Sequence, residues 1–363
     1  MKILLLGFTK IKFMPYLSFY LEQIDCIKND VNIVYWNRDL LDEDLSKYDK
    51  VTLHEYKAFM EDGISKVDKL KYFFGYRRFV TRLMKQYNFD IIISLHTLPG
   101  LCVLDKLLWS YKKNYILDYR DSTFENNKLF GYLVMLFARN ARVVFVSSDA
   151  FRKFLPCEGV EIITSHNILA DSLNYRNVRR DSYVPGNRIR ISFWGLIRDL
   201  KLNLKIMSRL ANDSRFELHY YGRAQSLGDK MEAFIKENEI NNIFLHGEYV
   251  PKDRYEFARR TDIIHNCFSD SNMLLAMSNK YYDGLIFYIP QLCMTGSYMG
   301  KRCAKQGVGC ELDPNKDNFA DMLYEYYHSL NQEEFERYCD VELESILKEY
   351  EYGNIVIKGL LNN

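Results

Sequence analysis

The feature that most constrains the fold is a repeated alternation of short apolar runs with longer segments of helical spacing. Short apolar runs bounded by turn-forming residues are typical of buried strands. Strands that alternate with helices form βαβ units, and such units assemble into a parallel sheet. The sequence therefore predicts an α/β fold, with strands at Ile3–Leu6, Val31–Trp36, Ile91–Leu95, Tyr115–Leu117, Val143–Val146, Ile189–Trp194, Phe216–Tyr221, Ile243–Leu245, Ile263–His265, Pro290–Met294 and Val308–Glu311.

The alternation is interrupted once, and the interruption predicts two domains. The segment Asp171–Arg190 is polar and contains the turn-forming run Pro185–Gly186–Asn187, which we interpret as a linker. A chain of 363 residues exceeds one ordinary domain of about 100–200 residues. Helical patterns include Pro15–Ile27, Pro99–Tyr111 and Phe319–Tyr352. We expect two Rossmann-like parallel-sheet domains facing a cleft, with an acceptor-side domain at 1–180, a donor-binding domain at 188–335, and a C-terminal helix at 336–363 that packs back toward the N-terminal domain.

Charge and cysteine content narrow the class of protein. A formal net charge of +1 provides no overall field that would attract nucleic acid. None of the eight cysteines forms a C-x-x-C pair, so we expect reduced thiols in a cytoplasmic protein. The apolar run that opens the chain is too short for a signal peptide, and we interpret it as the first strand. The longest apolar stretch, Leu129–Ala138, is about half of the roughly 20 residues that span a bilayer.

Basic residues follow the first strand of the second half. Gly195 ends that strand without a Cβ, so a ligand can approach the backbone there. Arg198 and Lys201 come next, at the start of a predicted helix whose dipole and unpaired N–H groups favour an anion. This arrangement suits a diphosphate, although a solvated charged turn would have the same sequence.

A second group of polar residues opens a later helix. Ser278 stands where it can cap a helix that carries Asn279, Lys280 and Asp283. Asn279 and Asp283 are four residues apart and share one helix face. A carboxylate at that position can accept two hydrogen bonds from a ribose diol. A capped surface helix is the alternative interpretation of the same residues.

These stretches resemble a known family. The segments ISFWGLIRDLK, FELHYYGRA, HGEYVPKDRYEFARRTDIIHN and MSNKYYDGLIFYIPQLCMTGSYMG, within Ile189–Asp313, are similar to the donor domain of retaining GT-B glycosyltransferases of the family-4 type from bacterial surface-polysaccharide synthesis. The resemblance implies that Arg198 and Lys201 hold the donor diphosphate. It also implies that Asp283 binds the ribose, that Tyr249 and Val250 lie near the base, and that Gly296–Met299 offer backbone N–H groups. The predicted donor site comprises Gly195, Arg198, Lys201, Arg223, Tyr249, Val250, Asn279, Lys280, Asp283, Ser297, Tyr298 and Met299.

The chain departs from this family at one position. The family often carries two glutamates eight positions apart, but the later acid here is Asp283 and the earlier position holds Leu275. Asp270 or Asn272 can replace the missing group, which leaves the donor sugar undetermined. No D-x-D pattern occurs in a suitable loop, so we expect a reaction that needs no metal ion.

The first half offers candidates for the acceptor side. Asp118, Arg120 and Asp121 close the strand at Tyr115–Leu117. Asp121 is the predicted base or orienting group, by similarity to related transferases. Asp118 and Arg120 have the alternative role of a structural ion pair. His96 follows another strand and could face the cleft or be structural.

A basic, aromatic segment at Lys66–Lys85 is the third signal. Its seven cations are accompanied by a single acid, Asp68, and its aromatic residues are interleaved with them. Such a helix can lie on an anionic membrane surface and meet a lipid-linked acceptor there. An ordinary solvated helix with aromatics packed on the core is the equal alternative, and no RNA-binding motif supports RNA.

The sequence therefore predicts a glycosyltransferase of the hexosyltransferase class. It would move a hexosyl or N-acetylhexosaminyl group from a nucleotide sugar, most simply a UDP-sugar, to a saccharide or lipid-linked acceptor, with retention, in surface polysaccharide or capsule synthesis. We expect no tightly bound cofactor and a cytoplasmic or peripheral-membrane location. A non-catalytic GT-B partner subunit and an enzyme like the UDP-sugar 2-epimerases remain alternatives. A nicotinamide dehydrogenase is disfavoured, because G-x-G-x-x-G follows no strand.

Overall fold

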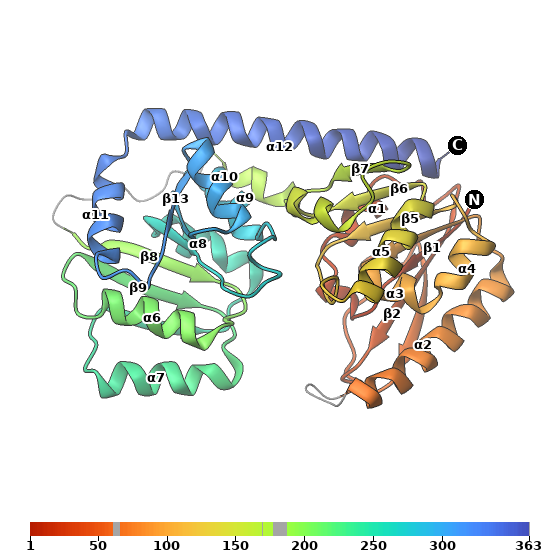
Figure 1. Cartoon of the computed structure of the whole chain (residues 1–363), viewed down its shortest axis with the longest axis horizontal. Helices are drawn as coiled ribbons and strands as arrows, with labels where there is room; N and C mark the ends of the chain where they lie inside the picture. Colours follow the sequence, from red (N-terminus) through yellow and green to blue (C-terminus); the bar gives the residue numbers. More distant parts are fainter. Residues whose placement is uncertain (61–65, 169, 177–186, 363) are drawn as a thin grey trace. The chain divides into compact units, whose positions relative to one another are not determined.

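The computed structural model describes residues 1–60, 66–168, 170–176 and 187–362. Half of the predicted linker, including Pro185 and Gly186, lies outside these ranges. The chain divides into two compact units. Unit 1 comprises Met1–His166 and Lys348–Asn363, and unit 2 comprises Asn167–Leu347 (Figure 1).

Unit 1 is built on a sheet of seven parallel strands in the order β3-β2-β1-β4-β5-β6-β7. The five strands predicted in this half are confirmed, whereas β3 and β7 were not predicted. Both of these lie at the edges of the sheet, where half-exposed residues weaken the apolar pattern. The bounds are β1 (Lys2–Leu6), β2 (Asp30–Asn37), β3 (Thr52–Lys57), β4 (Ile91–Leu95), β5 (Tyr115–Tyr119), β6 (Val143–Val146) and β7 (Glu161–Thr164).

Unit 2 is built on a sheet of six parallel strands in the order β10-β9-β8-β11-β12-β13. All six predicted strands of the second half are confirmed, so the predicted α/β class with two parallel sheets is confirmed as well. The bounds are β8 (Ile189–Trp194), β9 (Phe216–Tyr221), β10 (Ile243–Gly247), β11 (Ile263–Asn266), β12 (Gln291–Met294) and β13 (Gly309–Leu312).

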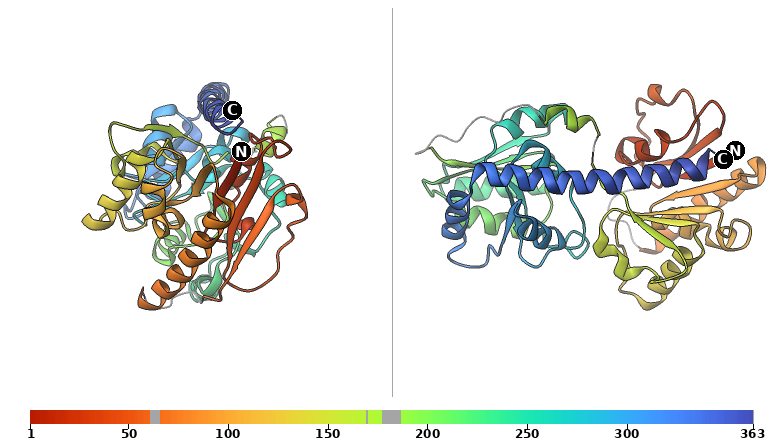
Figure 2. Two further views of the ribbon diagram at one scale, coloured as in Figure 1. Left: turned by 90° about the vertical axis from the view of Figure 1, so that its right-hand side faces the viewer. Right: turned by 90° about the horizontal axis from the view of Figure 1, so that it is seen from above.

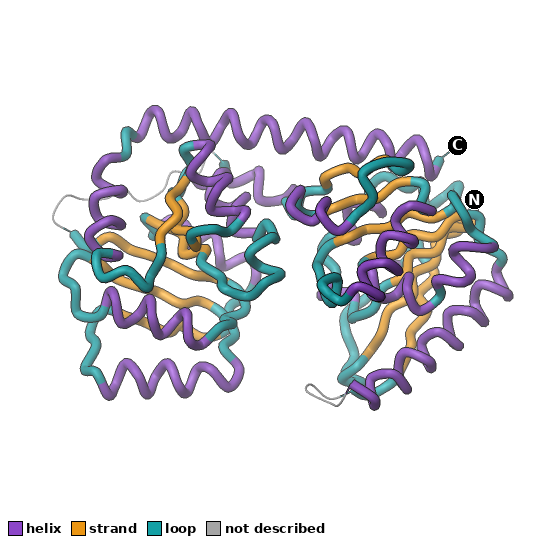
Figure 3. Tube along the Cα trace, viewed as in Figure 1, coloured by secondary structure: helices purple, strands orange, loops and turns teal. Residues whose placement is uncertain are grey.

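Helices connect most successive strands (Figure 3). The helix predicted over Pro15–Ile27 is wrong in length, because only α1 is α-helical there and irregular turns follow it. The single helix predicted at Pro99–Tyr111 is divided at Val103 into α3 and α4. The bounds are α1 (Leu17–Leu21), α2 (Lys66–Tyr87), α3 (Thr97–Cys102), α4 (Leu104–Trp109), α5 (Lys128–Asn140), α6 (Leu200–Leu210), α7 (Gly228–Glu237), α8 (Arg254–Arg259), α9 (Asn279–Phe287), α10 (Tyr298–Gln306), α11 (Phe319–Ser329) and α12 (Gln332–Leu361).

The C-terminal helix α12 begins in unit 2 and ends in unit 1. Its last turns carry Ile357 and Leu361 into the core of unit 1, where both side chains are fully buried. Burying an aliphatic side chain of this size contributes about 1.5–3 kcal/mol. The end of α12 and the chain's N-terminus therefore lie beside each other in unit 1, as both views in Figure 2 show.

The order of strands reverses at one place in each sheet, between β1 and β4 in unit 1 and between β8 and β11 in unit 2. In open parallel sheets, ligands bind outside the carboxyl ends of the strands at such a reversal. The carboxyl ends of β8 and β11 are therefore the place to look for a ligand site in unit 2. Within the described ranges, no helix is long and apolar enough to cross a membrane.

Candidate nucleotide-sugar site

Three glycines at the carboxyl ends of neighbouring strands line the candidate site in unit 2 with backbone atoms. Gly195, Gly222 and Gly247 end β8, β9 and β10 with φ of +125°, +140° and +76°, values that favour glycine. The Gly195 N–H donates to Tyr221 O at 3.0 Å, and the Gly222 N–H donates to Gly247 O at 2.6 Å. A Cβ at Gly222 would lie 1.8 Å from Gly195 O, so these loops need glycine to pack.

The space in front of Gly195 is open. A Cβ placed on Gly195 would have one neighbour within 4 Å, the Nζ of Lys280 at 4.0 Å. A ligand can therefore approach the backbone between the strand end and the Lys280 ammonium, as the sequence predicted for this glycine. The first residues of α9 are thus brought to the end of β8, from which they are separated by more than eighty residues of chain.

Lys280 is a buried cation without an acidic partner. Its side chain is on the first turn of α9, and the residue is only 7% exposed. Its Nζ lies 4.2 Å from the centre of the Phe193 ring and 4.9 Å from that of Phe268. Among the described residues, no carboxylate comes within ion-pair distance of it. Burial lowers the pKa of Lys280 to about 8, with Arg198 lowering it further and Asp283 opposing the shift.

A buried hydrogen-bond chain fixes the start of α9. The Ser278 hydroxyl donates to Asn266 Oδ1 at 2.8 Å, and Asn266 Nδ2 donates to Gln291 Oε1 at 2.8 Å. Gln291 Nε2 then donates to Tyr281 O at 3.0 Å. Ser278 holds the N-cap position, as predicted, but its side chain makes no capping hydrogen bond. Because the Ser278 hydroxyl donates to Asn266 in β11, the first turn of α9 has no side-chain cap.

Arg198 and Lys201 are exposed beside this position. The helix α6, which begins after Arg198 and contains Lys201, is capped by Asp199, whose Oδ1 accepts from the Leu202 N–H at 3.1 Å. The cap carboxylate offsets part of the positive helix end that was expected to attract an anion. Asn279 is exposed at the start of α9. Arg198 lies close enough to Lys280 to lower its pKa, and no contact in the described structure joins Lys201 to Lys280.

The predicted ribose-binding carboxylate is deeply buried. Asp283 Oδ2 accepts from Trp194 Nε1 at 3.0 Å, and Asp283 Oδ1 lies 3.8 Å from Arg254 Nη2. Burial raises the pKa of Asp283, while Arg254 and the Trp194 hydrogen bond oppose that shift. Sequence reasoning missed both partners, since Trp194 ends an apolar strand and Arg254 lies in a polar helical run that gives no sign of a buried role. Both carboxylate oxygens of Asp283 thus face protein groups, and the residue is only 3% exposed.

Tyr249 and Val250 follow β10 near this cluster. The Tyr249 ring packs edge-on against Phe257 at 5.1 Å. Burial raises the pKa of Tyr249, with Arg254 lowering and Asp283 raising it, so all three side chains share one neighbourhood. Val250 is exposed, and its N–H donates to Asp253 Oδ2 at 3.3 Å.

The remaining predicted donor residues have protein partners. Arg223 is exposed at 3.9 Å from Glu248, and Met299 is buried beneath the start of α9. The N–H groups of Gly296, Ser297 and Tyr298 donate to Glu311, Met294 O and Leu274 O. The backbone donors expected in this loop are therefore already paired at those three residues.

In unit 1, the acceptor-side candidates separate into two groups. Asp118 and Arg120 form a buried ion pair at 2.7 Å, with the Arg120 guanidinium 4.7 Å from the centre of the Tyr16 ring. The structural ion pair weighed in the sequence is thus present. Asp121 is 50% exposed and lies 3.9 Å from His96 Nε2.

His96 is held in a backbone conformation that side chains rarely adopt, with φ of +95°. Its Nδ1 accepts from the Leu98 N–H at 3.4 Å, which leaves the ring proton on Nε2, facing Asp121. Burial lowers the pKa of His96, with Asp121 opposing, so the imidazole is neutral at pH 7. The pair presents a neutral imidazole beside a solvent-exposed carboxylate at the carboxyl end of β4.

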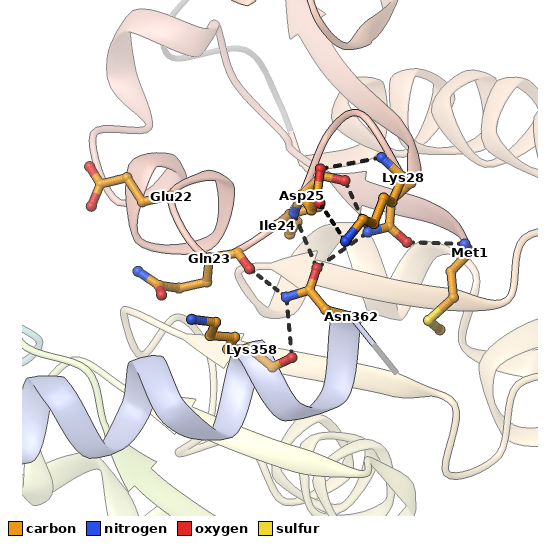
Figure 4. A pocket seen from close by; sticks show the side chains of 9 residues that line it. Met1, Glu22, Gln23, Ile24, Asp25, Lys28, Lys358 and Asn362 are labelled. Atoms are coloured by element: carbon orange, nitrogen blue, oxygen red, sulfur yellow. Dashed lines mark hydrogen bonds and ion pairs between the residues drawn. The ribbon is translucent and has the colours of Figure 1, made fainter.

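A separate cavity of about 520 Å³ lies at the opposite, amino edge of the unit 1 sheet (Figure 4). Asn362 crosses it, accepting from the Asp25 N–H at 3.1 Å and donating to Gln23 O at 2.8 Å. Met1 donates its amino group to Asn29 Oδ1 at 3.0 Å. These hydrogen bonds join the end of α12 to the segment between α1 and β2. No cluster of three or more His, Cys, Asp or Glu in the described ranges could hold a metal ion.

Neither a protein-family model nor a curated protein sequence matches the chain. Solved structures do match it. HepE of Anabaena in complex with UDP is 10% identical with a TM-score of 0.72, covering 100% of this chain and 98% of that one. The lipopolysaccharide outer core galactosyltransferase WaaB is 12% identical with a TM-score of 0.69, covering 99% and 100%. The chain has the GT-B fold.

A neighbour with a different activity shares this fold. A putative UDP-N-acetylglucosamine 2-epimerase of Listeria monocytogenes is 15% identical with a TM-score of 0.59, covering 93% of this chain and 90% of that one. The similarity is weaker than that to the two transferases. Since one GT-B architecture serves both activities, the function must be argued from the site.

Proposed function

We propose that the protein is a retaining glycosyltransferase that uses a nucleoside diphosphate sugar, with UDP-sugars as the first choice. The single observation that carries the proposal is Lys280, a buried ammonium with no acidic partner among the described residues, facing open space at Gly195. A buried charge is costly unless it is paired. An anion at the carboxyl end of β8 would supply the missing partner, and a diphosphate is the anion that this fold most often serves there.

Each group of residues has a role in this proposal. Lys280 and Arg198 stabilise the charge that develops on the leaving diphosphate, with Lys201 at longer range. Asp283 accepts from the ribose through Oδ1, the oxygen that faces Arg254, and Tyr249 and Val250 contact the base. Arg223, Asn279 and the Ser297–Met299 turn border the donor. The side chains themselves supply the positive charge, so no metal ion is required.

Asp121 with His96 serves the acceptor. The exposed Asp121 carboxylate can orient an acceptor hydroxyl and take its proton, and the neutral imidazole of His96 lies beside that carboxylate. The reaction transfers a hexosyl or N-acetylhexosaminyl group to a saccharide or lipid-linked acceptor, as in bacterial surface polysaccharide or capsule synthesis. The protein works in the cytoplasm or on the inner face of the cytoplasmic membrane. The likeness to HepE with UDP and to WaaB supports this assignment.

Thermal unfolding with UDP, GDP, CMP and their sugars, without added metal, tests the proposal. A ligand at a hundredfold excess over its dissociation constant stabilises the folded state by about 2.7 kcal/mol. We expect a selective rise of the melting temperature with UDP and one UDP-sugar, and its loss in Lys280→Met. No shift with any nucleotide would favour a non-catalytic partner subunit.

Turnover of the selected sugar nucleotide without any acceptor separates the epimerase alternative. An epimerase converts the donor alone into a second sugar nucleotide. A transferase leaves the donor intact or slowly releases free UDP and sugar. Formation of an epimer would contradict the proposed transfer.

A further inference from the structure

The inner face of α2 packs on the sheet of unit 1. Tyr76 is fully buried and its hydroxyl donates to Gly7 O at 2.7 Å. The Phe73 ring lies 5.3 Å from that of Phe8, and the Phe79 ring lies 5.6 Å from that of Tyr56. Tyr76 is therefore a core residue, and the half-buried Phe73 and Phe79 pack against neighbouring rings. Packing on the sheet of unit 1 accounts for these inner-face aromatic residues without a binding partner. It does not account for the residues on the solvent-facing side of α2.

The outer face of α2 combines exposed apolar side chains with cations. Leu70 is 52% exposed and Phe74, one turn later, is 68% exposed. At about 100° per residue, these two and the exposed cations fall within an arc of roughly 120° that contains no acidic residue. We call this set the α2 outer face, which comprises Leu70, Lys71, Phe74, Arg78, Arg82 and Lys85.

The cations of this face are largely uncompensated. Lys71 pairs with the exposed Asp68 at 3.1 Å, at the start of the helix. Arg78, Arg82 and Lys85 have no ion-pair partner in the described ranges. By contrast Arg77, which points toward the neighbouring helix α4, pairs with Asp105 at 2.6 Å. Arg77 is thus neutralised by a protein carboxylate, whereas Arg78, Arg82 and Lys85 face solvent.

This combination fits one class of partner. Single exposed apolar residues are ordinary on protein surfaces. Leu70 and Phe74 are different, because they are adjacent on the helix and flanked by unpaired cations. An interfacial helix inserts such side chains at the headgroup boundary while its cations meet lipid phosphates. A nucleic acid would use the cations but not the two apolar side chains.

We propose that the α2 outer face docks unit 1 on an anionic lipid bilayer. Docking would bring the protein to lipid-linked acceptors. This biological role rests on the proposed function. The docking itself requires neither donor nor acceptor. Each cation near an anionic surface is worth about 1 kcal/mol, so the three unpaired ones together raise the partition into a bilayer by roughly 100-fold.

Cosedimentation of the full chain with vesicles tests the proposal. The vesicles are pure phosphatidylcholine, or phosphatidylcholine with about a third phosphatidylglycerol, at low and high salt. We expect binding to the anionic vesicles alone, weakened at high salt. The triple variant Arg78→Glu, Arg82→Glu, Lys85→Glu should bind at least about 100-fold more weakly. In Phe74→Trp, the indole emission should shift to the blue on anionic vesicles.

The control carries the same charge change elsewhere. Lys230→Glu, Lys236→Glu, Lys305→Glu replaces three exposed lysines of unit 2 and should bind like the unmodified protein. Equal losses in the two triple variants would overturn the proposal, as would no binding by the unmodified protein. A double variant Leu70→Ser, Phe74→Ser that binds vesicles normally would also overturn it, in favour of a general polyanion surface. Nucleotide binding, measured on the same samples without lipid, reports separately on the proposed function.

Discussion

Two buried cations lie near the carboxyl ends of the two sheets, and their surroundings differ. Arg120 is 5% exposed and Lys280 is 7% exposed. Arg120 pairs with the fully buried Asp118 at 2.7 Å. Lys280 contacts two aromatic rings and has no carboxylate within ion-pair distance in the described structure. The two cations are thus similarly buried, but a protein carboxylate neutralises the charge of Arg120 in unit 1 and none among the described residues does so for Lys280 in unit 2.

Under the proposed function, the difference separates an ion pair that stabilises the fold from a cation whose partner is a bound anion. A buried ion pair is strongly destabilised when one partner is removed, because the other charge remains without compensation. A buried cation without a partner already carries that cost in the free protein. Its folded-state pKa is below its unfolded value, so it costs stability below about pH 8 and the cost is relieved as the pH rises.

The largest effect expected is on stability in unit 1. Asp118→Ala should lower the free energy of unfolding by about 3–5 kcal/mol, because Arg120 would stay buried and unpaired. Urea denaturation measures this value. Asp68→Ala, which removes an exposed partner of Lys71, is the control and should change stability by less than about 1 kcal/mol. A loss below 1 kcal/mol in Asp118→Ala would break the comparison.

Lys280→Met should have the opposite signature. Losing a hydrogen bond to a charged group costs about 1.5–3 kcal/mol, so UDP affinity should fall roughly 10- to 100-fold. The free energy of unfolding should not decrease, because no partner is left unpaired. Isothermal calorimetry and urea denaturation measure the two quantities. Lys236→Met, on the exposed face of α7, should alter neither. Loss of stability without loss of affinity would make Lys280 a structural residue.

Substitutions of Arg198 and Lys201, beside the start of α6, test how far the site extends from Lys280. Arg198→Ala should weaken UDP binding about tenfold, the loss of roughly one charged contact. Lys201→Ala should weaken it less, since Arg198 is the residue that influences Lys280. The exposed Arg337→Ala serves as the control. A larger effect for Lys201 would mean that the anion lies at the start of α6 and away from Lys280.

The smallest effect concerns His96. Its φ of +95° is a conformation that glycine adopts without strain, so His96→Gly should raise the free energy of unfolding by about 1 kcal/mol. UDP affinity, a property of unit 2, should stay the same. Decreased stability would show that the His96 side chain stabilises the fold. The strained backbone at His96 would then no longer support a role in acceptor binding.

Sequence alone predicted most of the framework. Most of the eleven predicted strands have strong apolar runs because they are buried on both faces of a parallel sheet, with the edge strand β10 as an exception. The edge strands β3 and β7 were missed: β3 has no buried residue and mixes polar with apolar types, and β7 has only four residues, of which the first and last are polar. The predicted helix lengths were wrong at Val103, which separates α3 from α4, and after α1, which ends at Leu21.

The site was predicted in part. Gly195, Lys280 and Asp283 were chosen from local pattern, and the structure brings Gly195 and Lys280 together. The partners of Asp283 could not be predicted, because Trp194 and Arg254 reach it from distant positions in the chain. Likewise, nothing in the run Gly296–Met299 indicates that its N–H groups donate to Leu274 and Glu311.

The most direct test of the central claim is the pH dependence of UDP affinity. With a pKa of about 8 in the free protein, Lys280 loses its proton as the pH rises, and the anion loses its partner. Titration calorimetry between pH 7 and pH 9 should show a roughly tenfold loss of affinity in the unmodified protein. Lys280→Met should show weak binding that changes little over the same range. Parallel pH curves for the two proteins would contradict the assignment of Lys280 as the diphosphate's partner.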